Sequence, residues 1–347
     1  MPRARARNHV LRALWAALLV VVGCAASDPR PAPMGADGGV PTAPSPIAQA
    51  PPVPASAPTV EATDAGLAEA LDGGGSAAAG DSGGFAGGAR DGDMRLVPAG
   101  TFVMGSETGE RDERPPHPVT LAAFWLDETE VTNEAYGRCV AAGTCRPPSP
   151  RNADLNHVGP DSRFRGRRQP ISSVSWDDAR AYCGSVGKRL PREAALERAA
   201  RGDDGRRYPW GNEPPTPERA SFSSAVTSDV GAYPAGAGPW GHLDLAGNVW
   251  EWCEDVYDPY AYTRPGAARG EGGSCRQALA AQEDLRRKKL DGFTGTNPIP
   301  EECERVLRGG AFNYDAPGLR SSNRVHHPAR FRLVMSGLRC ARDVARP

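Results

Sequence analysis

Alternating tryptophans mark the most informative hydrophobic pattern of this chain, in residues 244–253. In an extended strand, which repeats every two residues, Trp250 and Trp252 point to one face while Glu251 and Cys253 point to the other. We therefore predict a strand that anchors both indoles in a core and turns Glu251 away from them.

Helical periodicity and capping residues predict helices elsewhere in the chain. Thr132 and Ser175 each precede a helical pattern as N-cap residues, and Pro191 opens a further helix that ends at Gly202. Residues 277–290 combine strong helix formers with a basic end that suits the helix dipole, which predicts a short surface helix.

Strand-like runs and turn residues fill much of the rest. Residues 94–105 hold two such runs around a Pro-Ala-Gly turn, which predicts a hairpin. From Tyr208 onward, Gly and Pro recur so often that long ordered loops are expected there, and such loops usually need metal ions or disulfides to hold them.

The composition divides the 347-residue chain into unequal parts. Its 41 Gly and 34 Pro exceed what one compact domain needs, and much of the excess lies in the first quarter. We expect a disordered Pro/Ala/Gly-rich tether at 24–93 and one folded domain at 94–344. With a net charge of -1 the chain has no field that would attract nucleic acid or an anionic membrane surface.

The first 23 residues have the order of a secretory signal peptide, with four arginines before a short apolar run. The sequence around Cys24 resembles the bacterial lipobox, in which the cysteine is lipidated. Ordinary secretion with a chance cysteine is the alternative. Lipidation at Cys24 would hold the protein on a membrane through its anchor alone, and the following Ala25 favours the outer membrane.

A series of short motifs suggests a family. They are Val97-Pro98-Ala99-Gly100, Glu130-Val131-Thr132-Asn133, Ser175-Trp176-Asp177-Asp178-Ala179, Lys188-Arg189-Leu190-Pro191, Pro209-Trp210-Gly211-Asn212, Gly247-Asn248-Val249-Trp250-Glu251-Trp252, Leu307-Arg308-Gly309-Gly310 and Gly337-Leu338-Arg339-Cys340. In this order they resemble the formylglycine-generating enzyme, or sulfatase-modifying factor, family. The resemblance implies an α+β, C-type-lectin-like fold that is rich in loops.

The resemblance does not carry the family's oxidase chemistry with it. The oxidases bind one copper ion through two cysteines shortly after the Arg-Gly-Gly turn, because thiolates suit Cu(I). In this chain Tyr314 and Leu319 occupy those two positions. We therefore expect neither copper nor formylglycine-generating activity.

An iron site is not expected either. An enzymatic branch of the superfamily adds a helical bundle with three iron-binding histidines, and we recognise no such bundle here. His326 and His327 are adjacent, so on a strand they point to opposite faces, which is poor geometry for one metal ion.

Calcium is the cofactor that the resemblance does imply. The family's structural Ca²⁺ takes carboxylate and carbonyl oxygens around the Gly-Asn turn, and those positions are Asp244, Gly247, Val249 and Glu251 here. The alternative is that Asp244 and Glu251 are solvated or paired with arginine. Arginines near the C-terminus are expected to pair with acids rather than to bind nucleic acid.

Seven cysteines follow Cys24, and export makes disulfides the expected state. Cys183 and Cys340 match a disulfide of the family. Cys139 and Cys145 flank a short Gly-containing span, and Cys275 and Cys303 bracket an insertion that they would staple. Cys253 is then left unpaired, although the sequence equally allows it to replace Cys275 or Cys303.

These features together predict a lipid-anchored, calcium-stabilised binding or scaffold protein of the cell envelope. Its ligand would be a protein or an envelope glycan, held on loops. The alternative is a periplasmic enzyme, acting on a peptidyl or siderophore-like substrate or as a formylglycine-generating oxidoreductase.

Overall fold

The computed structural model describes residues 89–148, 162–288, 290 and 302–345. The expected signal peptide, Cys24 and the tether up to residue 88 lie outside the described residues. Within them, no helix has the length and apolar character to cross a lipid bilayer.

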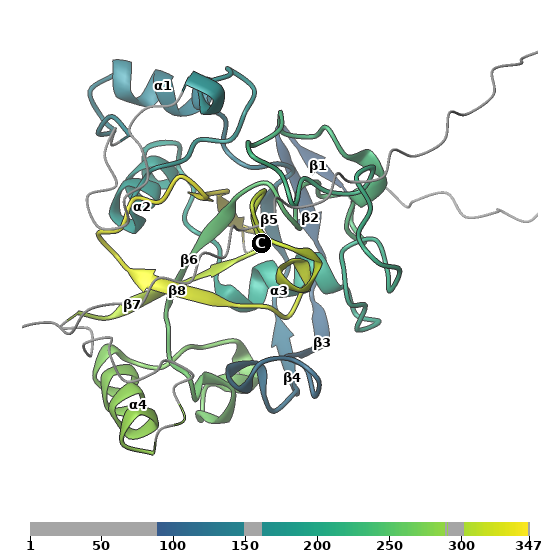
Figure 1. Cartoon of the computed structure of the whole chain (residues 1–347), viewed down its shortest axis with the longest axis vertical. Coiled ribbons are helices and arrows are strands. Elements are labelled where there is room, and N and C mark those ends of the chain that lie inside the picture. The colour runs from purple at the N-terminus through teal and green to yellow at the C-terminus, as the bar shows by residue number, and fades with distance from the viewer. Residues whose placement is uncertain (1–88, 149–161, 289, 291–301, 346–347) are drawn as a thin grey trace, which may run out of the picture. The chain divides into compact units, whose positions relative to one another are not determined.

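Two four-stranded sheets and a β-ribbon form the β part of the fold (Figure 1). The first sheet has the order β1 (Arg90–Asp91), β2 (Met94–Val97), β5 (Phe124–Asp127) and β10 (Ala341–Asp343), with antiparallel neighbours. The second has the order β8 (Val325–Pro328), β7 (Glu304–Arg308), β6 (Trp250–Val256) and β9 (Ser336–Gly337), and β9 runs parallel to β6. The ribbon pairs β3 (Gly100–Met104) with β4 (His117–Leu121).

The predicted hairpin at 94–105 is wrong. β2 pairs with β1 and β5, whereas β3 pairs with β4, so the Pro-Ala-Gly turn moves the chain from one sheet to another. The two strands bury their apolar side chains in different clusters: Val97 packs near α3 and Phe124, while Phe102 packs against Val119 of β4. Strand β1 also lies within the last residues of the range that we gave to the tether.

Four α-helices lie in the described part of the chain, and the N-caps of two of them and the glycine that ends a third follow the sequence prediction. They are α1 (Asn133–Ala141), α2 (Trp176–Ser185), α3 (Glu193–Arg201) and α4 (Cys275–Arg287). The Thr132 hydroxyl accepts a hydrogen bond from the Ala135 amide, Ser175 and Asp178 form a reciprocal capping box, and Gly202 ends α3 with φ at 69°.

The first four residues of the central strand β6 are buried on both faces. Trp250 and Trp252 lie in the largest hydrophobic cluster, as predicted, together with Trp176 of α2. Cys253 lies in a second cluster that includes residues of α3. Glu251 is 1% exposed, so it faces a second buried layer rather than solvent. Because α3 contacts β3, β6 and β7, it links the ribbon to the second sheet.

Three disulfides join the pairs that the sequence suggested. Cys139 bonds to Cys145, Cys183 to Cys340, and Cys275 to Cys303. The second of these ties α2 to the segment before β10, and the third encloses α4 together with the insertion. Cys253 is the free cysteine of the described residues, and it is fully buried.

Candidate functional site

The turn that precedes β6 has a tightly constrained backbone. Asp244, Gly247 and Asn248 have φ values of 56°, 90° and 58°, in the left-handed region that favours glycine. A Cβ atom on Gly247 would lie 2.2 Å from the Ser221 carbonyl oxygen. The turn therefore requires glycine at this position and holds Asp244 and Asn248 in fixed orientations.

Glu130 fixes this turn by hydrogen bonds, although it precedes the turn by 118 residues in the sequence. Glu130 was not identified from the sequence as a site residue. Its carboxylate accepts hydrogen bonds from Asn248 Nδ2 at 2.6 Å and from the Val249 amide at 3.1 Å. The Asn248 side-chain oxygen in turn accepts from the Ser228 amide. The only signal in the sequence was that Glu130 opens the Glu-Val-Thr-Asn motif.

The acidic side chains of the expected calcium site are buried, and each is hydrogen-bonded or ion-paired within the protein. Asp244 accepts from the Gly231 amide at 2.6 Å. Glu251 forms a two-pronged ion pair with Arg339, whose Nε and Nη2 each lie 2.7 Å from a carboxylate oxygen. Burial raises the pKa of Asp244 and of Glu251, although Arg339 opposes the shift. Arginine pairing, the alternative that the sequence left open, therefore holds for Glu251.

Buried carboxyl groups nevertheless outnumber guanidinium groups around this turn. Burial, Asp244 and Glu251 together raise the pKa of Glu130 well above its ordinary value, so three buried carboxyl groups share one guanidinium. The donor set of Asp244 with the backbone carbonyls of Gly247 and Val249 consists of the hard oxygens that Ca²⁺ prefers. The described part of the chain contains no group of three or more His, Cys, Asp or Glu side chains placed to hold a metal ion. A calcium ion would thus depend on backbone oxygens as much as on side chains.

A second buried cluster of charges lies between α3 and β7. Arg308 of β7 contacts Glu193 at 2.7 Å and Glu197 at 2.8 Å, and Arg324 binds the same Glu193 carboxylate at 2.7 Å. The Tyr262 hydroxyl lies 2.6 Å from Arg308. Burial pushes the pKa of Glu193 upward, but the two arginines outweigh this effect and leave it below the ordinary value.

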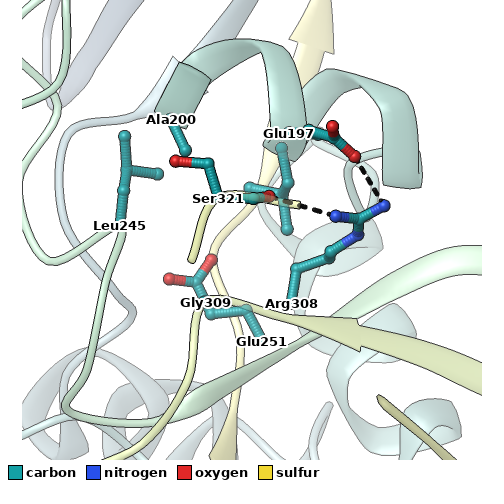
Figure 2. Close-up of a pocket in the computed structure, with 8 residues that line it drawn as sticks. Glu197, Ala200, Leu245, Glu251, Arg308, Gly309 and Ser321 are labelled. Carbon is teal, nitrogen blue, oxygen red and sulfur yellow. Dashed lines mark hydrogen bonds and ion pairs between the residues drawn. The ribbon is translucent and has the colours of Figure 1, made fainter. Parts of the chain in front are cut away.

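The cavity beside this cluster is small (Figure 2). Figure 2 shows Arg308 bound to Glu197 on α3 and to the backbone of Ser321, with Glu251, the neighbour of Arg308 across the β6–β7 pair, lining the same cavity. Its volume is about 10 Å³, which is enough for one water molecule. The charges at this cavity therefore support the fold and do not line a substrate pocket.

The loop after Arg308 separates the two positions at which the resemblance places copper ligands. Tyr314 packs edge-on against Trp250, with ring centroids 5.3 Å apart, at the margin of the largest cluster. Leu319 is 1% exposed and lies in a different cluster with Tyr208 and Ala246. The residues at the two positions supply no sulfur, and their side chains pack into different parts of the protein.

Cys253 does not replace the missing pair. Its thiol is buried, and burial together with Glu193 and Asp255 raises its pKa well above the ordinary value. Cys275 and Cys303, which the sequence allowed as partners for it, are bonded to each other. No second free thiol accompanies Cys253 among the residues that the structure describes.

Comparison with known proteins identifies the fold. A model of the sulfatase-modifying factor enzyme 1-like domain matches residues 86–344. The chain belongs to this family. The result confirms the α+β fold that the motifs implied.

The similar proteins include a protein named as a kinase and a protein named as inactive. The serine/threonine-protein kinase Pkn1 of Chlamydia trachomatis is 33% identical over 271 residues, which cover 73% of this chain and 38% of the kinase. The inactive C-alpha-formylglycine-generating enzyme 2 of Mus musculus is 32% identical over 220 residues, which cover 49% of this chain and 71% of that protein. This chain thus spans well under half the length of the kinase that it matches.

Among solved structures, PvdO from Pseudomonas aeruginosa is similar to this chain with a TM-score of 0.56 and 25% identity. The match covers 72% of this chain and 94% of PvdO.

The two adjacent histidines do not converge on one point. His326 lies 2.6 Å from Glu304 and stacks on Tyr257, whereas His327 packs against Phe331.

The six arginines near the C-terminus each pair with an acid: Arg320 with Glu113, Arg324 with Glu193, Arg330 with Glu302, Arg332 with Asp178, Arg339 with Glu251 and Arg342 with Asp91.

Proposed function

We propose that this member of the sulfatase-modifying factor family is a binding or scaffold protein of the cell envelope without copper oxidase chemistry. The observation that carries the proposal is the pair Tyr314 and Leu319 at the two copper-ligand positions. A phenol and an alkyl side chain cannot hold Cu(I) as a pair of thiolates does.

The packing of these two residues supports the same conclusion. Tyr314 rests on Trp250, and Leu319 is enclosed by apolar and aromatic side chains. Neither position is a cavity into which a metal ion and a substrate thiol would fit without rearrangement. A relative that is itself named inactive supports the idea that this fold persists without the oxidase reaction.

The ligand that we propose is a protein or an envelope glycan, bound by the loops between the strands. Lipid on Cys24 would hold the chain at the outer membrane, and the tether expected at residues 24–93 would join this anchor to the folded domain.

Structural calcium is part of this proposal. Asp244 and the carbonyl oxygens of Gly247 and Val249 would hold the ion, with Glu251 close by. The excess of buried carboxyl groups over guanidinium groups at the turn supports a bound cation.

Oxygen uptake separates a binding protein from an oxidase. The full chain would be supplied with Cu(I) and a Cys-containing sulfatase peptide, and oxygen consumption would be recorded beside an active formylglycine-generating enzyme as positive control. We expect no uptake above that of copper and peptide alone. Catalytic turnover by this protein would overturn the proposal and favour the enzymatic alternative.

A further inference from the structure

We propose that a group of three exposed arginines and one half-buried arginine, on α1 and the loop before residue 170, binds an acidic segment of a protein partner. The arginine patch, as we name it, consists of Arg138, Arg165, Arg167 and Arg168. This inference rests on the proposed binding function and specifies one ligand class for it.

The loop that carries three of these arginines is rigidly held. Asn133 Nδ2 donates to the backbone oxygens of Phe164 at 2.9 Å and Gly166 at 3.0 Å. Gln169, which is buried, accepts from the Gly166 amide at 2.7 Å and donates to the Thr227 oxygen at 2.8 Å. A fixed backbone lowers the entropy lost when its side chains bind a partner.

Three of the four arginine side chains extend into solvent, whereas Arg165 is half-buried. Side-chain exposure is 81% for Arg167, and 71% for both Arg168 and Arg138. Their charge is only partly balanced, because Arg167 and Arg138 share Glu134, and Arg168 lies 3.7 Å from Asp229. Arg165 has no ion-pair partner in the described ranges.

An exposed arginine elsewhere on the domain shows a different arrangement. Arg269 has a carboxylate of its own at short distance, that of Glu271. Among the described residues, three of the four arginines share two acids and Arg165 has none, which leaves a local surplus of positive charge.

The chemistry of the patch favours carboxylates on a protein. Guanidinium groups bind carboxylates in two-pronged geometry. A membrane-binding surface would add exposed apolar side chains, but the large exposed hydrophobic residues of the described chain are Val103, Val186, Leu290 and Val344, and none of them belongs to the patch. A single-stranded nucleic acid would need exposed aromatic rings, and the nearby Phe164 is buried against Phe312.

The position of the patch links it to the loop that follows Arg308. Phe164 and Phe312 have ring centroids 5.3 Å apart, and the Val230 amide donates to the Arg168 oxygen. The loop that carries Arg165, Arg167 and Arg168 is thus packed directly beside the segment that contains Tyr314. Figure 1 shows α1 and α2 on one side of the domain, away from α4.

Fluorescence anisotropy of a labelled oligoglutamate peptide with the full chain tests the proposal. We expect binding that weakens as salt is added. The double variant Arg165→Gln/Arg168→Gln should bind roughly fivefold more weakly, because each exposed ion pair contributes a modest free energy. The matched variant Arg111→Gln/Arg276→Gln removes two exposed arginines outside the patch and should bind like wild type.

Several outcomes would overturn the proposal. One is an equal loss of affinity in both double variants, and another is an absence of salt-dependent peptide binding by wild type. Patch-dependent binding of a polyuronate glycan or of anionic vesicles in preference to the peptide would assign the patch to another ligand class. Far-ultraviolet circular dichroism checks that both variants are folded. A negative peptide-binding result would overturn only the arginine patch, and oxygen uptake would overturn only the proposed function. The two experiments therefore test the two proposals separately.

Discussion

Asp255 is an ionisable residue whose surroundings in the fold shift its pKa. Asp255 accepts a hydrogen bond from the Glu193 amide at 2.7 Å, at the start of α3. Burial, followed by the charge of Glu193, raises its pKa from 3.8 to about 6. In the unfolded chain this carboxyl group would return to its ordinary pKa.

This raised pKa predicts a pH dependence with a definite sign. Between about pH 4 and pH 6 the folded protein binds the Asp255 proton more than the unfolded protein does, so stability falls as pH rises through this window. The Asp255→Asn variant keeps a hydrogen-bond acceptor but does not titrate, and it should lose this part of the dependence. Urea unfolding across the window measures it.

Glu283 supplies the control for this measurement, because it is an exposed acid on α4 and is not among the charges that shift the pKa of Asp255. The Glu283→Gln variant should keep the wild-type pH profile. An Asp255→Asn profile as steep as that of wild type would show that this carboxyl group does not titrate as described.

At the residue scale, local chemistry was predictable and distant partners were not. Thr132 and Ser175 cap helices because a side-chain hydroxyl satisfies an amide a few residues on. Glu130 was missed because its partners, Asn248 and Val249, lie more than a hundred residues away. The arginine that pairs with Glu251 could be named only once the fold brought Arg339 beside it.

At the scale of elements, the helices were more predictable than the strand pairings. α2 and α3 follow from periodicity and stop signals contained in each segment. β2 and β3 are adjacent in sequence, yet each finds its partner elsewhere because the two strands bury side chains in different clusters. A turn signal predicts that the chain changes direction, but the cores decide which strands pair.

The disulfides should differ in how much they stabilise these elements. Cys183–Cys340 spans 157 residues and Cys139–Cys145 spans 6. In the chain-entropy model a longer closed loop gives more stabilisation, about 5 kcal/mol for the first bond and about 2 kcal/mol for the second. Replacing both cysteines of each pair by serine and measuring the free energy of unfolding tests this order. A larger loss from the 139–145 pair would contradict it.

At the scale of the whole molecule, the calcium proposal makes a thermal prediction. If an ion offsets the surplus of buried carboxyl groups around the turn, a calcium chelator should lower the Tm of wild type, and added Ca²⁺ should restore it. The Asp244→Asn variant should respond less to the chelator, whereas Asp204→Asn, which changes an exposed acid, should respond like wild type. An unchanged Tm for wild type would remove calcium from the account.

The family and the fold class could be predicted from the motifs, whereas the proposed absence of oxidase chemistry rests on two residues. Motifs such as Gly-Asn-x-Trp-Glu-Trp predicted the family and its α+β architecture, which the comparisons confirm. The same fold carries proteins with different names, so Tyr314 and Leu319 say more about activity here than the architecture does.

Copper binding tests this claim most directly. The full chain would be titrated anaerobically with Cu(I) against a competing chelator, in wild type and in Cys253→Ser, which removes the buried free thiol. The account predicts that neither protein retains copper against the chelator. One copper ion held per chain by wild type and lost in Cys253→Ser would reveal a thiolate site and contradict it.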